Sequence, residues 1–409
     1  MSKRKPEVQP PEWQAPEKPA ELSLEIATIT PLFGGGYAAR ECDELIPVRS
    51  AAVRGHLRFW WRATAGARFT SVQELYEAEC TIWGGPSDKN KSRVGKVRVR
   101  TEVLHPGTKK SYSQIAPKST PKAGPRHGFF LFPFQEAKNQ NIPEASGLEG
   151  VKFMLYVDYV GEVSDQQKQE VERAVKAWLI FGGIGARTRR GCGALRVVGE
   201  HKNWLLPADR DSREPFLKQL LGGSANRRDY PTLAGATIVV GEPQDDPMKV
   251  WSELGRFWAR FRKGHFGNNI QYDPMSGGRW GDYRGVLCQL RNVHNTVSLA
   301  KPFLGLPIIY QKLKGTCFDG AIEPADSGRM ASPVILKPVA LDDGRFAPLI
   351  AVLHAQKPTQ VKINSVPYTL REPDASQEPV LKALKAQNVL DGVVKAAQQH
   401  FTGTQIIHL

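Results

Sequence analysis

The sequence predicts an α+β protein with two ferredoxin-like domains in tandem, each in the RRM-like order βαββαβ. In its first half, segments with the two-residue period of half-buried strands alternate with segments of helical period. Their order matches a ferredoxin-like domain with a long insertion between the second and third strands. A comparable but less regular series follows in the second half. We therefore expect domains at 21–205 and 206–409, after a disordered proline-rich leader at 1–20.

In the first domain, Val53, Leu57 and Trp60 recur at helical spacing on one face of the first expected helix. The second expected helix begins at Ser164, which forms a capping-box pattern with Gln167. Strands are expected from the alternation of apolar and polar residues. The expected strands are 22–30, 94–104, 152–159 and 194–198, and the expected helices are 50–68 and 164–181.

The insertion at about 105–150 begins with a basic stretch, 105–127, that contains no acidic residue. Unstructured segments of this length are uncommon inside domains and are usually functional or disordered. We expect this stretch to become ordered on meeting RNA or a neighbouring subunit. The apolar stretch 129–134 that follows is expected to be one arm of a projecting hairpin.

The second domain should begin with a strand at 236–240 and a helix opened by Asp246 and Pro247. The apolar face of that helix carries Trp251, Leu254 and Trp258. Further expected elements are strands at 334–340, 348–354 and 360–369 and a final helix at about 378–399.

The formal net charge is +15, from 56 Lys and Arg against 41 Asp and Glu. Such a surplus favours binding to nucleic acid or to another polyanion. The five cysteines include no C-x-x-C pair, so we expect neither a disulfide framework nor a zinc site. No segment approaches the roughly 20 apolar residues of a membrane helix. We expect a soluble cytoplasmic protein with no membrane partner.

The first basic segment is PVRSAAVRGHLRFWWR, residues 47–62, at the start of the first expected helix. Arg54, Arg58 and Arg62 recur every four residues, which makes a cationic stripe beside the apolar face. Arg49 precedes them, and the segment contains no acid. Gly55 inside a helix costs about 1 kcal/mol relative to Ala, so it indicates a close approach by a partner.

The second basic segment is GGIGARTRRGCG, residues 182–193, which we call the Gly-Arg loop. It lies between a helix and a strand, so it matches neither a Walker A loop nor a dinucleotide-binding fingerprint. Glycines expose backbone N–H groups with little steric cover, and arginines add charge-assisted bonds to phosphate. We expect its RNA-contacting residues to be Gly182, Gly183, Gly185, Arg187, Arg189, Arg190, Gly191 and Gly193.

Signals for catalysis are weak. The nine histidines form no H-E-x-x-H or H-x-H pattern, and no acidic cluster resembles a two-metal site. We therefore expect no catalytic residue, no metal and no cofactor. His56 lies beside the arginines and is the one candidate for a general base in metal-free RNA cleavage.

The two basic segments resemble the RAMP superfamily of CRISPR proteins. Within it, they are most similar to the family of first-named subunits of the type III-B (Cmr) effector complexes. Gly305-Leu306-Pro307 and the segment 329–333 resemble elements of that family's second domain. Cys192 stands where the family's loop usually has an aromatic residue, and the leader lies outside the family's core.

The resemblance implies two RAMP domains of ferredoxin-like fold and membership of an RNA-guided complex. It implies a subunit that holds the 3′ part of the CRISPR RNA with the paired target single-stranded RNA, beside other RAMP subunits. The slicing activity belongs to another subunit of such complexes, so this chain is expected not to be an enzyme.

Two other functions remain open at this point. One is a metal-free CRISPR RNA-processing endoribonuclease of the same superfamily, with His56 as the base. The other is a protein-docking scaffold whose basic segments meet acidic subunits instead of RNA.

Overall fold

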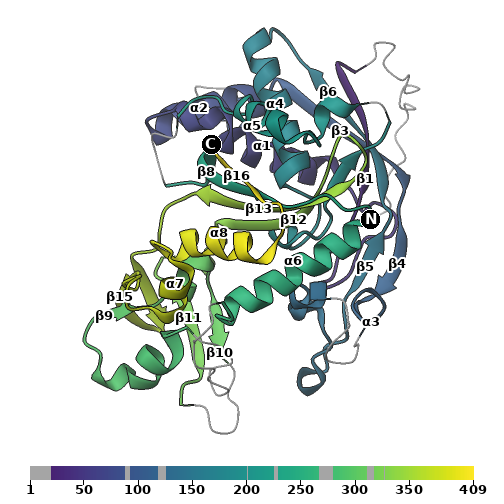
Figure 1. Cartoon of the computed structure of the whole chain (residues 1–409). Helices are drawn as coiled ribbons and strands as arrows, with labels where there is room; N and C mark the ends of the chain where they lie inside the picture. The colour runs from purple at the N-terminus through teal and green to yellow at the C-terminus, as the bar shows by residue number, and fades with distance from the viewer. Residues whose placement is uncertain are drawn as a thin grey trace, which may run out of the picture.

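A computed structural model of the chain describes residues 20–87, 93–117, 126–199, 201–224, 229–266, 280–310, 317–326 and 328–409 (Figure 1). Residues 1–19 of the expected leader and 118–125 of the basic insertion lie outside these ranges. The first domain contains a four-stranded antiparallel sheet in the order β3-β6-β1-β7. Its strands are β1 (Leu22–Thr28), β3 (Val97–His105), β6 (Lys152–Tyr159) and β7 (Leu195–Val197).

The helices α1 (Ser50–Ala63) and α4 (Asp165–Phe181) connect these strands and cover one face of the sheet. Ser164 and Gln167 form the expected capping box at the start of α4. A further helix, α2 (Val72–Trp83), follows α1 and was not assigned from the sequence. Ser71 caps its N-terminus by accepting a hydrogen bond from the backbone N–H of Glu74.

The insertion supplies β5 and β4, which join the short strand β2 in a small sheet of order β2-β5-β4, and it does not form the expected hairpin at 129–134. Pro133 lacks an N–H for a ladder, and Phe130, Leu131 and Phe134 turn into the core, so this stretch forms short 3₁₀ turns. Strand β2 (Leu32–Phe33) follows β1 in the chain, and the elements of the insertion itself are β4 (Thr108–Ser111), α3 (Tyr112–Ile115) and β5 (Ser146–Glu149).

The second domain repeats the strand order of the first. Its four-stranded antiparallel sheet runs β12-β13-β8-β16, which is again second, third, first and fourth strand of a βαββαβ series. The predicted α+β class with tandem ferredoxin-like domains is therefore confirmed. The elements are β8 (Thr232–Val240), α6 (Pro247–Arg262), β12 (Val334–Ala340), β13 (Phe346–His354), α8 (Val389–His400) and β16 (Gln405–His408), and α5 (Arg210–Lys218) precedes them.

An accessory five-stranded sheet, which the sequence did not predict as a separate unit, is inserted into the second domain. It takes up the expected strand at 360–369 as a hairpin of two strands. The expected final helix is also two helices, because Lys385 adopts a left-handed conformation and Asn388 caps a new helix start. These elements are β9 (Thr296–Ser298), β10 (Ile308–Tyr310), β11 (Gly320–Pro324), β14 (Gln360–Ile363), β15 (Val366–Arg371) and α7 (Pro379–Leu384).

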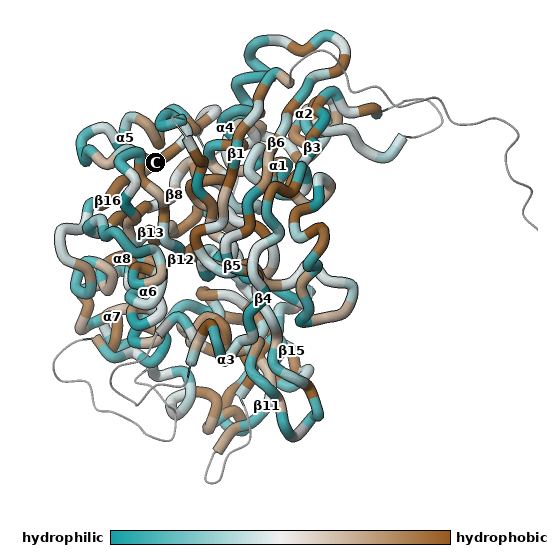
Figure 2. The backbone as a smooth tube through the Cα atoms, turned by 90° about the vertical axis from the view of Figure 1, so that its right-hand side faces the viewer, coloured by the Kyte–Doolittle hydropathy of each residue, from teal (hydrophilic) through white to brown (hydrophobic). Residues whose placement is uncertain are grey.

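The two domains stack so that the sheet of the second is covered on both faces (Figures 1 and 2). Ile335 and Val339 of β12 share a core with α1, α4 and the first sheet. Val334 and Leu336, on the opposite face, share a core with α6 and α8. Every residue of β12 is buried, as expected for a strand with no solvent-facing side.

Lys337 lies at the centre of this contact, fully buried on the β12 face toward the first domain. Its ammonium donates hydrogen bonds to the carbonyl oxygens of Leu179 (2.9 Å) and Gly182 (2.8 Å) at the C-terminus of α4. The C-terminal carbonyls of a helix carry partial negative charge and lack intrahelical donors. Lys337 therefore fixes the end of α4, where the Gly-Arg loop begins, against the second domain.

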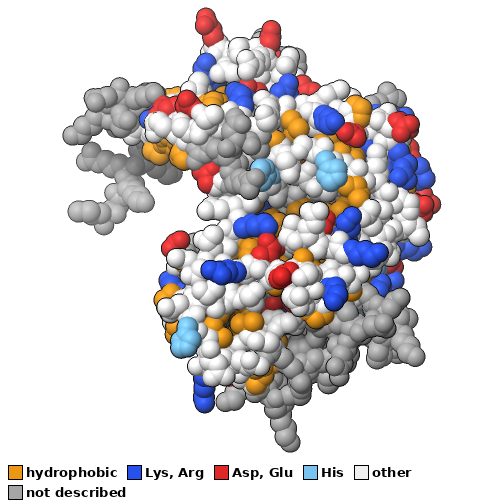
Figure 3. Space-filling model, turned by 60° about the vertical axis from the view of Figure 1, so that its left-hand side comes forward, with side chains coloured by type: hydrophobic (Ala, Val, Ile, Leu, Met, Phe, Trp, Pro, Cys, Tyr) orange, Lys and Arg blue, Asp and Glu red, His pale blue; other side chains and the backbone are white. Residues whose placement is uncertain are grey.

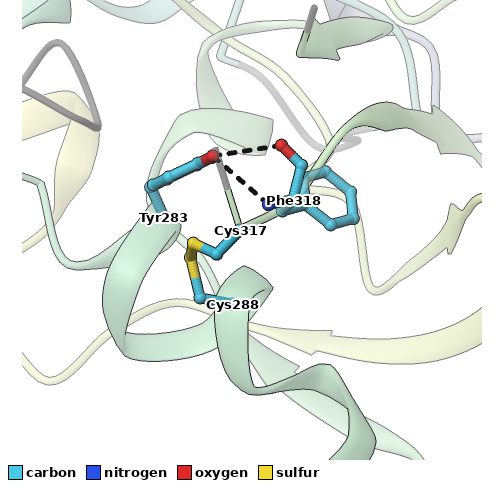
Figure 4. Close-up of a disulfide and its surroundings, with 4 residues drawn as sticks. All are labelled: Tyr283, Cys288, Cys317 and Phe318. Carbon is cyan, nitrogen blue, oxygen red and sulfur yellow. Dashed lines mark hydrogen bonds between the residues drawn. A yellow bond between two sulfur atoms is a disulfide. The ribbon is translucent and has the colours of Figure 1, made fainter. Parts of the chain in front are cut away.

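Cys288 and Cys317 form a disulfide, contrary to the expectation drawn from the cysteine spacing (Figure 4). They are 29 residues apart, but the fold brings their Cα atoms to 5.2 Å. Beside them the Tyr283 hydroxyl donates a hydrogen bond to the Phe318 carbonyl. The two cysteines are brought together by the tertiary structure, so no local cysteine motif could predict their pairing. Cys42, Cys80 and Cys192 are free and buried.

Burial lowers the pKa of Lys337 to about 7, well below the value of about 10.4 for an unfolded lysine. Between these values the unfolded chain binds more protons, so this residue makes stability rise with pH. We expect the wild type to gain up to about 1.4 kcal/mol per pH unit over a Lys337→Met variant between pH about 7 and about 10. Urea unfolding at each pH measures the difference.

The control is Lys382→Met, which replaces an exposed lysine on α7. Its difference from the wild type should stay flat with pH. A difference between wild type and Lys337→Met that is equally flat would contradict the lowered pKa of Lys337 and hence its burial at this contact.

Candidate nucleic-acid interface

The arginine stripe of α1 is held by α2. Arg58 Nε and Arg62 Nη1 both donate to Oε1 of Glu79, at 2.7 and 2.6 Å. Glu79 is buried, whereas the two arginines keep about a third of their side-chain surface exposed. Arg54 donates to the backbone carbonyl of Trp83. Two of the three cations thus share one carboxylate, and the stripe retains a net positive charge.

Glu79 is the functional residue that sequence reasoning missed. The sequence shows no acid on α1 itself. The carboxylate that pairs with Arg58 and Arg62 comes from α2, whose helical hydrophobic pattern is weak. The helical spacing of Leu75, Ile82 and Glu79 in α2 is the signal that could have found it. Arg49 is paired with Asp43 at 2.6 Å and is half-exposed at the N-terminus of α1.

The exposed face of α1 beside this stripe carries only small residues. Ala51, Ala52 and Gly55 are all exposed. A Cβ added at Gly55 would meet no atom within 4 Å, so no packing inside the protein requires glycine there. The glycine leaves the helix backbone open to a partner approaching from solvent.

On the other side of this strip, Arg189 of the Gly-Arg loop lies over the ring of Phe59, with its Cζ 5.6 Å from the ring centroid. Phe59 follows Gly55 by one helical turn. The two basic segments predicted from the sequence therefore flank one surface. This surface consists of Ala51, Ala52, Gly55 and Phe59, and we call it the α1 strip.

Most glycines of the Gly-Arg loop use their backbone groups inside the protein. Gly182, Gly183, Gly191 and Gly193 are buried. The N–H groups of Gly182, Gly191 and Gly193 donate to Trp178, Thr188 and Pro31 carbonyls. A side chain at Gly193 would overlap the Ile184 carbonyl, and one at Gly191 would lie 2.8 Å from Nε1 of Trp251. Close packing explains these two glycines, against the second domain for Gly191 and within the first domain for Gly193.

Gly185 and Arg187 are the exposed members of the loop. Arg187 has a φ of +59°, a left-handed conformation that is unfavourable for a residue with a side chain. Such strained residues concentrate at functional sites. Of the eight loop residues predicted to contact RNA, these two are presented to solvent most directly.

Arg189 and Arg190 are partly buried against the second domain. Arg189 donates to the carbonyl of Ser332, and Arg190 donates to that of Val334 at 2.6 Å. Burial lowers the pKa of Arg189 to about 10, and burial with repulsion from neighbouring arginines lowers that of Arg190 to about 9. Both groups are charged at neutral pH, and their carbonyl partners do not neutralise that charge.

Cys192 is fully buried, and burial raises the pKa of its thiol to about 12. It is a core residue with no exposed surface for base stacking. His56 is partly buried beside Trp178, with ring centroids 6.4 Å apart, and burial lowers its pKa. Among the described residues, no group of His, Cys, Asp and Glu side chains is arranged to hold a metal ion.

On the face drawn in Figure 3, Lys and Arg side chains are interspersed with Asp and Glu. The cations discussed above instead gather around the α1 strip, where Glu79 and Asp43 are the carboxylates paired with them. In the described ranges, no helix combines the length and apolar character needed to cross a membrane.

Comparison with known proteins identifies the family. The RAMP superfamily model matches residues 25–196, which include both basic segments. The Cmr subunit Cmr1-2 of Pyrococcus furiosus is 31% identical over 187 residues, 43% of this chain and 95% of that protein. The chain belongs to the RAMP superfamily, among its type III-B Cmr proteins.

Two solved structures share the fold of this RAMP protein. Cmr1 of Pyrococcus furiosus in its apo form aligns with a TM-score of 0.54 and 15% identity, over 94% of this chain and 97% of the other. A chain of the type III-B Cmr-beta complex, bound to cognate target RNA and AMPPnP, aligns with a TM-score of 0.51 and 12% identity. That alignment covers 94% of this chain and 100% of the other.

Glu79→Gln should destabilise the protein by about 2 kcal/mol, because it removes the charge that two arginines share in a partly buried site. The free energy of unfolding in urea measures this loss. Glu214→Gln, which breaks an exposed pair with Lys218, is the matched control and should change stability by less than about 0.5 kcal/mol. Equal effects of the two substitutions would show that Glu79 does not hold the stripe.

Proposed function

We propose that this chain is a non-catalytic RNA-binding subunit of a type III-B CRISPR effector complex. In this role it holds the 3′ part of the CRISPR RNA and the paired target RNA by phosphate contacts. The observation that carries the proposal is the α1 strip, an open helix surface flanked by arginines on both sides. One side has Arg54, Arg58 and Arg62, and the other has the arginines of the Gly-Arg loop.

The chemistry of this surface suits a phosphate backbone. Small residues let a backbone approach α1, and guanidinium groups bind phosphate oxygens through charge-assisted and bidentate hydrogen bonds. Arg49 and Arg187 extend the charge at the N-terminus of α1 and in the loop. The glycines at 182, 183, 191 and 193 support the site from inside, because they let the loop pack closely. Gly191 does so against the second domain and the other three within the first.

Such contacts position RNA without reading its sequence. In an RNA-guided complex, base pairing between guide and target supplies the sequence choice. The surface therefore needs no base-specific groups, and a cofactor or metal has no role in it. The relative Cmr1-2 is described as a Cmr subunit, and the Cmr-beta complex is described as bound to cognate target RNA, in keeping with this role.

Other RAMP subunits are the proposed protein partners, within the cytoplasm. Exposed apolar side chains just before α1 favour such a contact: Tyr37 is fully exposed, Leu45 is 84% exposed and Ile46 is 55% exposed. A scaffold that uses its basic segments for protein alone remains the competing function, and RNA affinity distinguishes the two.

We expect Gly55→Glu to lower the affinity for labelled single-stranded RNA by at least about tenfold, because it places a carboxylate in the middle of the α1 strip. Fluorescence anisotropy at several salt concentrations measures the affinity. The protein should stay folded, since a side chain at this position meets no neighbouring atom.

Gly55→Gln separates the effect of size from that of charge, and Gln399→Glu on α8 adds the same charge elsewhere. If Gly55→Glu leaves the RNA affinity unchanged, RNA does not bind at the α1 strip, and the docking scaffold becomes the favoured function. Denaturing gels of the same samples should show intact RNA without added metal. Cleavage that is lost in His56→Ala would replace the proposal with the endoribonuclease.

A further inference from the structure

A further arginine, on α6 of the second domain, approaches the Gly-Arg loop. The Cζ of Arg190 lies 4.8 Å from the ring centroid of Trp258 on α6. Arg262 follows Trp258 by four residues on the same helix, and residues four apart share a helix face. Repulsion from Arg187, Arg262 and Arg189, in addition to burial, lowers the pKa of Arg190. Arg262 therefore belongs to the same electrostatic site as the loop arginines.

The positive charge at this junction is not balanced by carboxylates. The hydrogen bonds of Arg189 and Arg190 go to carbonyl oxygens, which satisfy donors without cancelling charge. Arg262 is partly buried and makes no hydrogen bond or ion pair with the parts of the chain that the structure describes. Burial lowers its pKa, which is the mark of a desolvated charge.

Asp282 lies near Arg262 and Glu378 lies near Asp282, and both acids are engaged with other groups. Asp282 accepts hydrogen bonds from the backbone N–H groups of Ala300 (2.7 Å) and Lys301 (2.8 Å). Burial, and then the charge of Asp282, raises the pKa of Glu378 to about 7, so it carries about half a charge at neutral pH. Lys301, also buried, adds a cation beside them. The three loop arginines remain without a counter-charge.

A hydroxyl donor completes the site. Tyr310 of β10 has a buried Oη that makes no hydrogen bond within the described ranges. Burial raises its pKa, so the phenol stays protonated and able to donate. The charge of Arg262 acts on this group, which places the two side chains near each other. An unsatisfied buried donor beside a surplus of cations matches the needs of an anion with several oxygens.

We propose that Arg262 and Tyr310 complete, with Arg187, Arg189 and Arg190, a phosphate-binding seat at the junction of the two domains. Its ligand is a phosphodiester of bound RNA, an identification that rests on the proposed function. Each guanidinium has five N–H donors and uses at most two on the protein here, so most of them are available to phosphate oxygens. RNA on the α1 strip would thereby contact both domains.

Arg262→Gln should weaken binding of labelled single-stranded RNA roughly tenfold and reduce the salt slope by about 0.7, the loss of one phosphate contact. Arg262→Lys should keep most of the slope, because it retains the charge. Tyr310→Phe should weaken binding only about threefold, since it removes one neutral hydrogen bond. Arg256→Gln on the same helix, paired with Glu253 in an exposed position, is the control and should bind like the wild type.

Thermal unfolding with inorganic pyrophosphate tests the seat without RNA. Pyrophosphate should raise the melting temperature of the wild type and of Arg256→Gln but not of Arg262→Gln. If Arg262→Gln and Arg256→Gln show the same RNA affinity and the same pyrophosphate stabilisation, the proposed phosphate-binding seat is wrong, even if the wild type binds RNA. If pyrophosphate stabilises the protein only when Arg262 is present, but the wild type does not bind RNA, the phosphate-binding seat is supported and the proposed function is overturned.

Discussion

The sheet of the second domain lies between two helical layers, with α1 and α4 on one face and α6 and α8 on the other. A strand such as β12 then has no solvent-facing side, and a lysine in it must find its partners inside. Lys337 finds them in the free carbonyls at the end of α4. That contact fixes the start of the Gly-Arg loop. The loop then lies against Ser332 and Val334, whose carbonyls accept hydrogen bonds from Arg189 and Arg190.

The position of the loop determines the electrostatics of the junction. Its arginines meet backbone carbonyls of the second domain, so the interface satisfies their donors and leaves their charge in place. The stripe on α1 follows a similar rule, since one carboxylate, Glu79, orients two arginines. Each domain alone carries part of the cationic surface, and docking assembles it. Desolvated like charges oppose docking, and an anionic ligand would relieve that cost.

The sequence predicted what depends on local pattern. Strand alternation and helical spacing led to the two βαββαβ series, and the basic segments marked the residues that flank the α1 strip. Contacts between distant segments were out of reach. No sequence pattern near Arg58 predicts its ion pair with Glu79, and no cysteine motif predicts the Cys288–Cys317 disulfide. The loop glycines were predicted as phosphate contacts, while four of them are buried in close packing. Gly191 packs against Trp251 and β12 of the second domain, and the other three pack within the first domain.

The most direct test of the account is to map where RNA touches the protein. Single-stranded RNA carrying photoreactive uridines would be crosslinked to the full chain, and the crosslinked peptides identified by mass spectrometry. The account predicts crosslinks in both domains, from α1 and the Gly-Arg loop of the first and from the C-terminal half of α6 in the second. Crosslinks confined to the accessory sheet, or spread evenly over the basic surface, would contradict it.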